Sequence, residues 1–107
     1  MTEPYHFYQD LAAEIPATPE DSILSRSMFN ESKVKVTLFR FSPGQELTEH
    51  TAASPAILHF LEGDADLTLG PDAKTVQAGS WVYMPARLPH SLTARTPLTM
   101  LLLLLVE

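Results

Sequence analysis

The C-terminal run LTMLLLLLVE, residues 98–107, constrains the fold more than any other part of the sequence. A helix that crosses a membrane needs about twenty consecutive apolar residues, and this run is too short for that. It follows a Thr-Pro pair, has no polar face at helical spacing and has the length of a strand. We therefore predict a strand that is buried on both faces, covered by a second sheet or a second subunit.

The rest of the chain is a series of short apolar segments separated by turn residues. Turn signals such as Ser42-Pro43-Gly44 end one segment before the next begins. Nine prolines and four glycines favour strands and turns over helices. Strands at this spacing, with no helix between them, indicate an antiparallel sandwich or barrel. The expected strands are SILSRSMF, VKVTLFRF, PAILHFLE, ADLTLG, TVQAG, SWVYMP, HSLTA and the leucine run.

The length of 107 residues fits one compact domain and is too short for two. We expect an all-β barrel over residues 33–107. Residues 1–32 are expected to form an N-terminal arm and the first strand or strands. Pro16 and Pro19 break helices in the arm and leave room for one short turn around YQDLAAE.

Charge and composition exclude several classes of partner and chemistry. The formal net charge is −6 and the seven Lys and Arg residues form no cluster, so nucleic acid is not an expected partner. The absence of cysteine excludes disulfides, thiolate metal ligands and cysteine nucleophiles, and fits a reducing compartment. The start MTEPYHFYQD has no signal-peptide pattern. We therefore expect a cytoplasmic protein with neither a nucleic-acid nor a membrane partner.

Two segments place a histidine at a fixed distance from glycine or proline. In GQELTEHTAASPAILHFLEG, Gly44 precedes His50 by six residues and Gly63 closes the segment. In GSWVYMPARLPH, Gly79 precedes Pro85 by six residues and His90 by eleven. These intervals resemble the two motifs of the cupin superfamily, in particular its small single-domain, RmlC-like members. The resemblance covers residues 33–107 and implies a double-stranded β-helix, or jelly-roll barrel, with a pocket inside.

The same resemblance implies an incomplete metal site. Cupins commonly ligate one divalent ion with three histidines and a glutamate, and only His50 and His90 remain here. Ala52 stands at the second histidine of the first motif, and the glutamate position falls on Ala56 or Ile57. In the second motif, Arg87 and Ala94 replace glycine and asparagine. Zinc, iron, nickel, copper and manganese all remain candidates, because two imidazoles alone select none of them.

Other polar residues are poor substitutes for the missing ligands. Glu46 shares the side of His50 by alternation but lies about 13 Å from it along an extended strand. Strand alternation places His59 on the opposite face, at a sheet or subunit interface. His6 would reach the site only if the arm crossed the mouth of the barrel.

Alternation along the strands also predicts the lining of the pocket. Arg40 shares a face with Val34, Val36 and Leu38; either it points inward and clamps an anionic ligand at the mouth, or a bulge near Ser42-Pro43-Gly44 turns it outward. The side chains predicted to point inward beside the two histidines are Val36, Leu38, Thr48, Ala52, Ala56, Leu58, Phe60, Val82, Met84 and Leu92.

Three functions follow from these features. The resemblance implies a metal-dependent oxygenase or isomerase acting on a small organic molecule through His50 and His90. The lost ligands favour a metal-free protein that binds or senses a small molecule. The third alternative is a structural or partner-binding barrel. Under all three we expect a homodimer, because the leucine run is too apolar for one barrel face and cupins commonly pair with exchange of their N-terminal strands, here residues 1–32.

Overall fold

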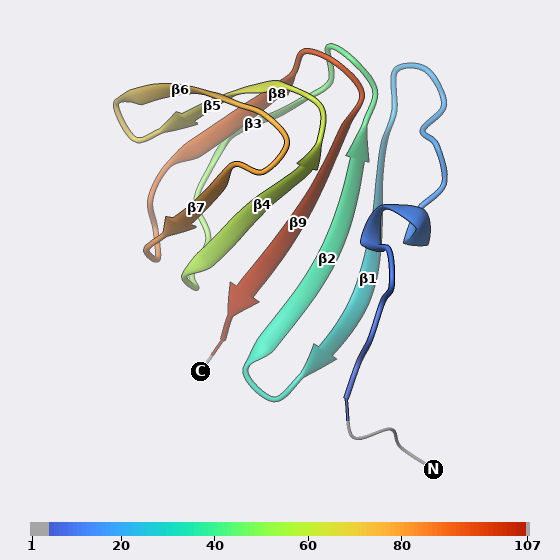
Figure 1. Ribbon diagram of the computed structural model, residues 1–107. Coiled ribbons are helices and arrows are strands. Elements are labelled where there is room, and N and C mark those ends of the chain that lie inside the picture. Colours follow the sequence, from blue (N-terminus) through green and yellow to red (C-terminus); the bar gives the residue numbers. More distant parts are fainter. Residues whose placement is uncertain (1–4, 107) are drawn as a thin grey trace.

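The computed structural model of the protein describes residues 5–106, which form two antiparallel sheets packed face to face (Figure 1). The predicted all-β, single-domain jelly-roll fold is confirmed. The five-stranded sheet has the order β1 (Ile23–Glu31), β2 (Val34–Phe41), β9 (Leu98–Leu105), β4 (Ala56–Glu62) and β7 (Trp81–Met84). The four-stranded sheet has the order β3 (Glu46–His50), β8 (His90–Ala94), β5 (Ala65–Leu69) and β6 (Asp72–Val76). One short 3-10 helix, η1 (Leu11–Glu14), precedes the strands.

The leucine run forms β9, which lies between β2 and β4 and pairs antiparallel with both. Its first four residues are buried. Met100, Leu102 and Leu104 face the four-stranded sheet, whereas Leu101 and Leu103 face the other way. The prediction of a strand is therefore confirmed, and the four-stranded sheet covers its inner face. Burial on both faces holds for its first half, since residues 102–105 are only partly buried.

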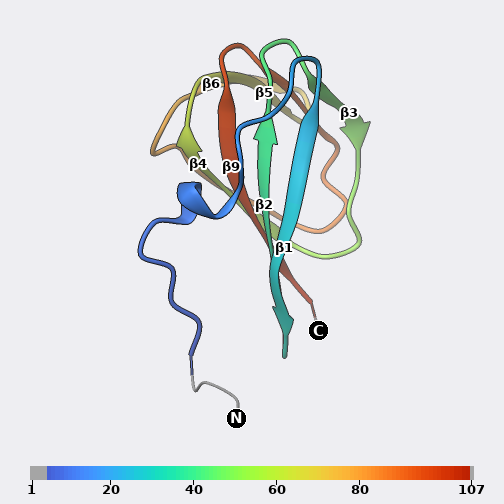
Figure 2. The same ribbon diagram turned by 90° about the vertical axis from the view of Figure 1, so that its right-hand side faces the viewer.

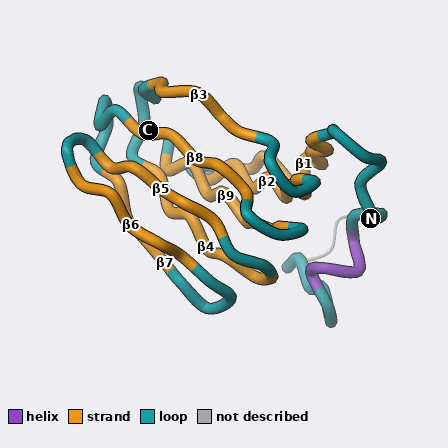
Figure 3. The backbone as a smooth tube through the Cα atoms, turned by 90° about the horizontal axis from the view of Figure 1, so that it is seen from above, coloured by secondary structure: helices purple, strands orange, loops and turns teal. Residues whose placement is uncertain are grey.

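The barrel core lies between the two sheets, which form two layers when the molecule is seen from above (Figure 3). Apolar side chains fill it because each strand alternates one inward and one outward position. Phe41, Phe60 and Leu67 are almost completely buried there. The buried members of this cluster are Phe41, Ala56, Leu58, Phe60, Ala65, Leu67, Val76, Met84, Leu92, Ala94, Leu98 and Met100.

A second cluster lies on the outer face of the five-stranded sheet, the face that points away from the four-stranded sheet. Val36, Leu38 and Leu101 are buried there beneath Ile15 of the N-terminal arm. The prediction that Val36 and Leu38 point into the barrel was therefore wrong. Both faces of VKVTLFRF carry large apolar side chains, so alternation alone does not tell which face is inside. Phe39 and Phe41 are the ones that join the barrel core.

The N-terminal arm runs beside β1 and places η1 against the five-stranded sheet (Figure 2). Two arginines hold it there, because Arg26 donates to the carbonyl of Glu14 and Arg40 Nη2 donates to the carbonyl of Ala12 at 2.9 Å. β1 pairs with β2 of the same chain. No helix within residues 5–106 is long and apolar enough to cross a membrane.

Two strands of the four-stranded sheet differ from the predicted segments. β3, which carries His50, was not among the expected strands, and β6 covers residues 72–76 instead of the predicted TVQAG. Both strands are mostly exposed and polar, so they lack the apolar alternation by which strands are recognised.

Candidate functional site

A β-bulge in β3 positions His50 beside His90 of β8. Leu47 pairs with Leu92 and His50 pairs with His90, so two residues of β3 stand opposite one residue of β8. Such a bulge shifts the alternation of one strand by one residue. Leu47 and His50 therefore point to the same side, into the barrel, and both line the same cavity.

The two imidazole rings lie together at the wall of the barrel. Their centroids are 4.2 Å apart and the rings are tilted by 59°. His50 Nδ1 lies 2.8 Å from the carbonyl oxygen of Thr48, and His90 Nδ1 lies 2.8 Å from that of Leu88. Since a carbonyl oxygen only accepts, each Nδ1 carries the hydrogen and donates it. In the neutral imidazoles each Nε2 is therefore a free acceptor.

A cavity of about 220 Å³ adjoins the histidine pair on the side of the strand connections. We call it the loop-side cavity, because Ala52, Ser54, Pro85 and Leu88 belong to the segments between strands. Small side chains at Ala52 and Ala56 contribute to its open space. The loop-side cavity is lined by His50, Ala52, Ser54, Ala56, Met84, Pro85, Leu88, His90, Leu102 and Leu104.

A second cavity, also of about 220 Å³, adjoins the same histidines on the side of the barrel core. We call it the core-side cavity. It shares His50, His90 and Leu102 with the loop-side cavity, so the histidine pair stands where the two cavities meet. The core-side cavity is lined by Phe39, Leu47, His50, Leu58, Leu67, His90, Ser91, Leu92, Met100 and Leu102.

The structure brings five of the predicted pocket residues to these cavities; Val36, Leu38, Val82 and Arg40 lie elsewhere, and two more line neither cavity. Thr48 is exposed and lines neither cavity, because the bulge turns its side chain away and leaves only its carbonyl to hold His50. Phe60 is fully buried in the barrel core and lines neither cavity. Those that do line them are Ala52, Ala56 and Met84 on the loop side, and Leu58 and Leu92 on the core side.

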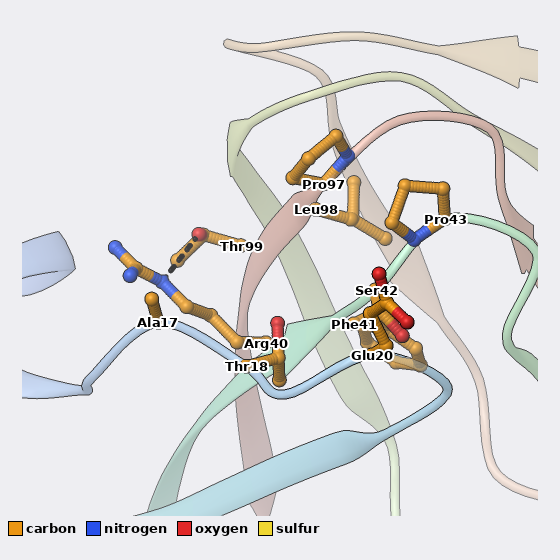
Figure 4. A pocket seen from close by; sticks show the side chains of 10 residues that line it. All are labelled: Ala17, Thr18, Glu20, Arg40, Phe41, Ser42, Pro43, Pro97, Leu98 and Thr99. Carbon is orange, nitrogen blue, oxygen red and sulfur yellow. Dashed lines mark hydrogen bonds between the residues drawn. The ribbon is translucent and has the colours of Figure 1, made fainter.

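Arg40 lies on the outer face of the sheet with Val36 and Leu38 (Figure 4). Of its two predicted orientations the outward one is observed, and its place among the pocket residues is corrected. Its Nε donates to Thr99 Oγ1 at 3.1 Å, and Nη2 lies 3.3 Å from Glu62 Oε1. Thr99 in turn donates to the same carboxylate oxygen at 2.7 Å. This arginine borders a separate cavity of about 260 Å³, which lies between residues 17–20 and the start of β9. Val82 likewise lines neither histidine cavity.

The two remaining histidines line neither cavity. His59 is on the outer face, in register with Leu101 and Trp81. His6 Nε2 lies 2.7 Å from Glu31 Oε2, and its ring stacks on Phe29 at a centroid distance of 4.3 Å. His6 therefore fixes the arm to the end of β1 and does not reach the mouth of the barrel.

Several lining residues were missed at the sequence level. Phe39 and Met100 were missed because both faces of their strands are apolar. Leu102 and Leu104 lie two and four residues after Met100 and therefore share its face of the strand. This spacing was the sequence signal that could have identified them. Leu47 could be predicted as a lining residue only if the position of the bulge in β3 were already known. The others missed are Ser54, Pro85, Leu88, Ser91 and Leu67.

The site offers fewer metal ligands than a complete centre needs. Within residues 5–106, no group of three or more His, Cys, Asp or Glu side chains could hold a metal ion. Catalytic zinc usually has three protein ligands. The described residues therefore fall short of a complete metal centre, and of the expected ligands only His50 and His90 lie together.

Comparison with protein families assigns the fold. The cupin domain family matches residues 37–106, which include both histidines of the pair. The chain belongs to this family. No curated protein matches the chain.

Solved structures extend this likeness to the whole chain. A conserved protein of unknown function from Streptococcus pyogenes is 28% identical, with a TM-score of 0.83 over 100% of this chain and 91% of that one. A cupin superfamily protein from Desulfitobacterium hafniense is 22% identical, with a TM-score of 0.86 over 97% and 94%. Salicylate 1,2-dioxygenase from Pseudoaminobacter salicylatoxidans is 16% identical, with a TM-score of 0.74 over 88% of this chain and 28% of that one. The last two share the fold alone.

Proposed function

We propose that the protein binds a small organic molecule at the histidine pair, in the two cavities that meet there. The observation that supports this most directly is the orientation of the two imidazoles. Each is fixed by an Nδ1–carbonyl hydrogen bond of 2.8 Å, which leaves its Nε2 as an acceptor next to apolar surface. A pocket that is mostly apolar, with a few convergent polar groups, is the usual form of a small-molecule site.

The chemistry of the pair defines what it can recognise. Within residues 5–106 neither Nε2 has a hydrogen-bond partner, so a ligand O–H or N–H would satisfy an acceptor that the fold leaves open. Burial of the ligand body against the leucines and methionines around the pair supplies the hydrophobic contribution, about 25 cal/mol per Å² of apolar surface. The same Nε2 atoms could accept a proton from a bound hydroxyl, which is the first step of general-base chemistry.

Removing the histidine that accepts the ligand's hydrogen bond is expected to weaken binding about tenfold, because one hydrogen bond contributes about 1 kcal/mol or slightly more. A fragment library screened by amide chemical-shift changes should yield ligands that shift residues near Ala52 and Ser91. Affinities would then be measured for His50→Ala and His90→Ala.

His59→Ala is the matched control, since His59 lines neither cavity. It is expected to bind the same fragments with unchanged affinity. If the histidine-pair variants bound every fragment as tightly as the control, the proposed site would be excluded.

A weak divalent-metal site is the second candidate function, and one observation favours it. Histidine ligands of metals almost always donate their other ring N–H to a carbonyl, carboxylate or water, as both His50 and His90 do. The two Nε2 atoms would hold the ion, with ligand or solvent oxygens at the remaining positions. Such an ion would supply Lewis acidity to a bound oxygen, and imidazoles alone do not select among zinc, iron, nickel, copper and manganese.

Calorimetric titration with Zn²⁺ and Ni²⁺ tests the metal site on tag-free protein. We expect weak binding of one ion per chain, lost in His90→Ala and retained in His59→Ala. Equal binding by both variants would show that the ion is held elsewhere. If the wild type bound neither ion, the metal site would be excluded and the metal-free binding of a small molecule would remain as the proposed function.

A homodimer through the outer face of the five-stranded sheet is also part of the proposal. Trp81 and Tyr83 of β7 are 58% and 49% exposed, and Tyr83 is in register with Ile57 on the same face. Exposed aromatic side chains next to half-buried aliphatic ones are typical of interfaces. Light scattering should give twice the chain mass at micromolar concentration, and Tyr83→Glu should shift the protein to the monomer; a monomeric wild type would contradict this.

A further inference from the structure

The histidines are the only residues in the linings of the two cavities that can carry a charge. Ser54 and Ser91 are the other polar side chains, and every remaining lining residue is apolar. While the histidines are neutral, an ionised ligand would lose part of its hydration there without gaining an opposite charge. The site therefore favours a neutral ligand over a carboxylate or an ammonium ion.

The core-side cavity has the size of a single ring. Its volume is about 220 Å³. An apolar cavity of about 150 Å³ in another protein accepts benzene, so this one is large enough for one aromatic ring. Phe39 and Met100 line it, and both make contacts with aromatic rings that add to the effect of burial.

The loop-side cavity gives room for a second group beyond the histidines. It shares His50, His90 and Leu102 with the core-side cavity, and the side chains of its wall are small at Ala52 and Ala56. A group attached to the carbon next to the hydroxyl-bearing carbon would enter this cavity while the ring stays on the core side.

We propose, on the basis of the small-molecule function proposed above, that the ligand is a neutral phenol with a substituent ortho to its hydroxyl. The ring occupies the core-side cavity. The hydroxyl donates to Nε2 of His50 or His90, and the ortho substituent occupies the loop-side cavity. No covalent step is required for this recognition.

Four probe compounds test the proposal on chelator-treated wild-type protein, by titration followed through amide chemical shifts. We expect phenol to bind and 2-propylphenol to bind at least about tenfold more tightly, because its additional methylene groups are buried. Anisole, the methyl ether of phenol, lacks the donor and is expected to bind about tenfold more weakly than phenol. Benzoate, which is ionised, is expected not to bind.

Two cavity-filling variants assign the parts of the ligand to the cavities. Ala52→Leu should remove the advantage of 2-propylphenol over phenol and keep phenol binding. Leu47→Phe should weaken the binding of both compounds, because Leu47 lines the core-side cavity. The larger side chain lies on β3, an edge strand in which Leu47 is only partly buried. Ala53→Leu is the matched control, because Ala53 is exposed and lines neither cavity. Thermal unfolding confirms that each variant is folded.

The outcomes separate the two levels of the proposal. If anisole or benzoate bound as tightly as phenol, or if Ala52→Leu kept the preference for 2-propylphenol, the ligand class would be overturned. Small-molecule binding would then still stand on any other fragment whose affinity falls in His50→Ala and His90→Ala. If no compound bound at the pair, both proposals would be overturned.

Discussion

Replacing Gly63 with alanine is expected to lower the free energy of unfolding by about 4 kcal/mol, a large fraction of what a domain of this size possesses. Gly63 connects β4 to β5 with φ of +88°. A Cβ atom there would lie 2.1 Å from the carbonyl oxygen of Pro97 and 3.0 Å from Cα of Leu98. Both are backbone atoms at the start of the buried strand β9, so neither can move without disturbing the core. Urea unfolding followed by circular dichroism measures the loss.

Gly44→Ala is the matched control for this substitution. Its φ of +86° is nearly the same, yet a Cβ atom there would meet nothing within 4 Å. The control should therefore lose only the left-handed strain, about 1–2 kcal/mol. If the two variants were equally destabilised, the close approach of Gly63 to Pro97 would not be the cause.

The fold was predictable because its strongest signals are local. The leucine run has the length and position of a strand, and turn residues separate the apolar segments whatever their partners. What could not be predicted depends on contacts made across the fold. The outer position of Val36 and Leu38 depends on Ile15 of the arm, which covers them from more than twenty residues away in the sequence.

The histidine pair was recognisable from motif spacing, whereas its surroundings were only partly so. His50 and His90 are forty residues apart in the sequence, and the pairing of β3 with β8 brings their rings to 4.2 Å. Strand alternation then failed at Thr48, because a bulge leaves no mark in the sequence. The same bulge brings Leu47 into the core-side cavity, so one extra residue changes both what lines the site and what supports it.

The departures from the cupin motifs have a consistent physical result. By the resemblance, Ala52 stands at a ligand position and the glutamate position falls on Ala56 or Ile57; Ala52 and Ala56 both line the loop-side cavity. Each replacement removes a potential metal ligand and leaves a small apolar side chain in its place. The loss of ligands and the gain of space for an organic group therefore occur at the same positions, which favours recognition of a ligand by shape and hydrogen bonding.

Phe60→Ala is expected to lower the free energy of unfolding by about 3–5 kcal/mol, the usual range for a buried phenylalanine. The Phe60 side chain is fully buried between the sheets, and its backbone bonds Ser80 and Gly79 next to β7. The substitution therefore opens a cavity in a region that is held in place by hydrogen bonds and cannot collapse fully.

Phe60→Leu separates the packing role of this residue from a role in the pocket. It preserves most of the volume and is expected to lose about 1 kcal/mol in urea unfolding. Because Phe60 lines neither histidine cavity, folded Phe60→Leu should bind fragments with wild-type affinity. A selective loss of affinity in this variant, with stability close to that of the wild type, would show that Phe60 contacts the ligand after all.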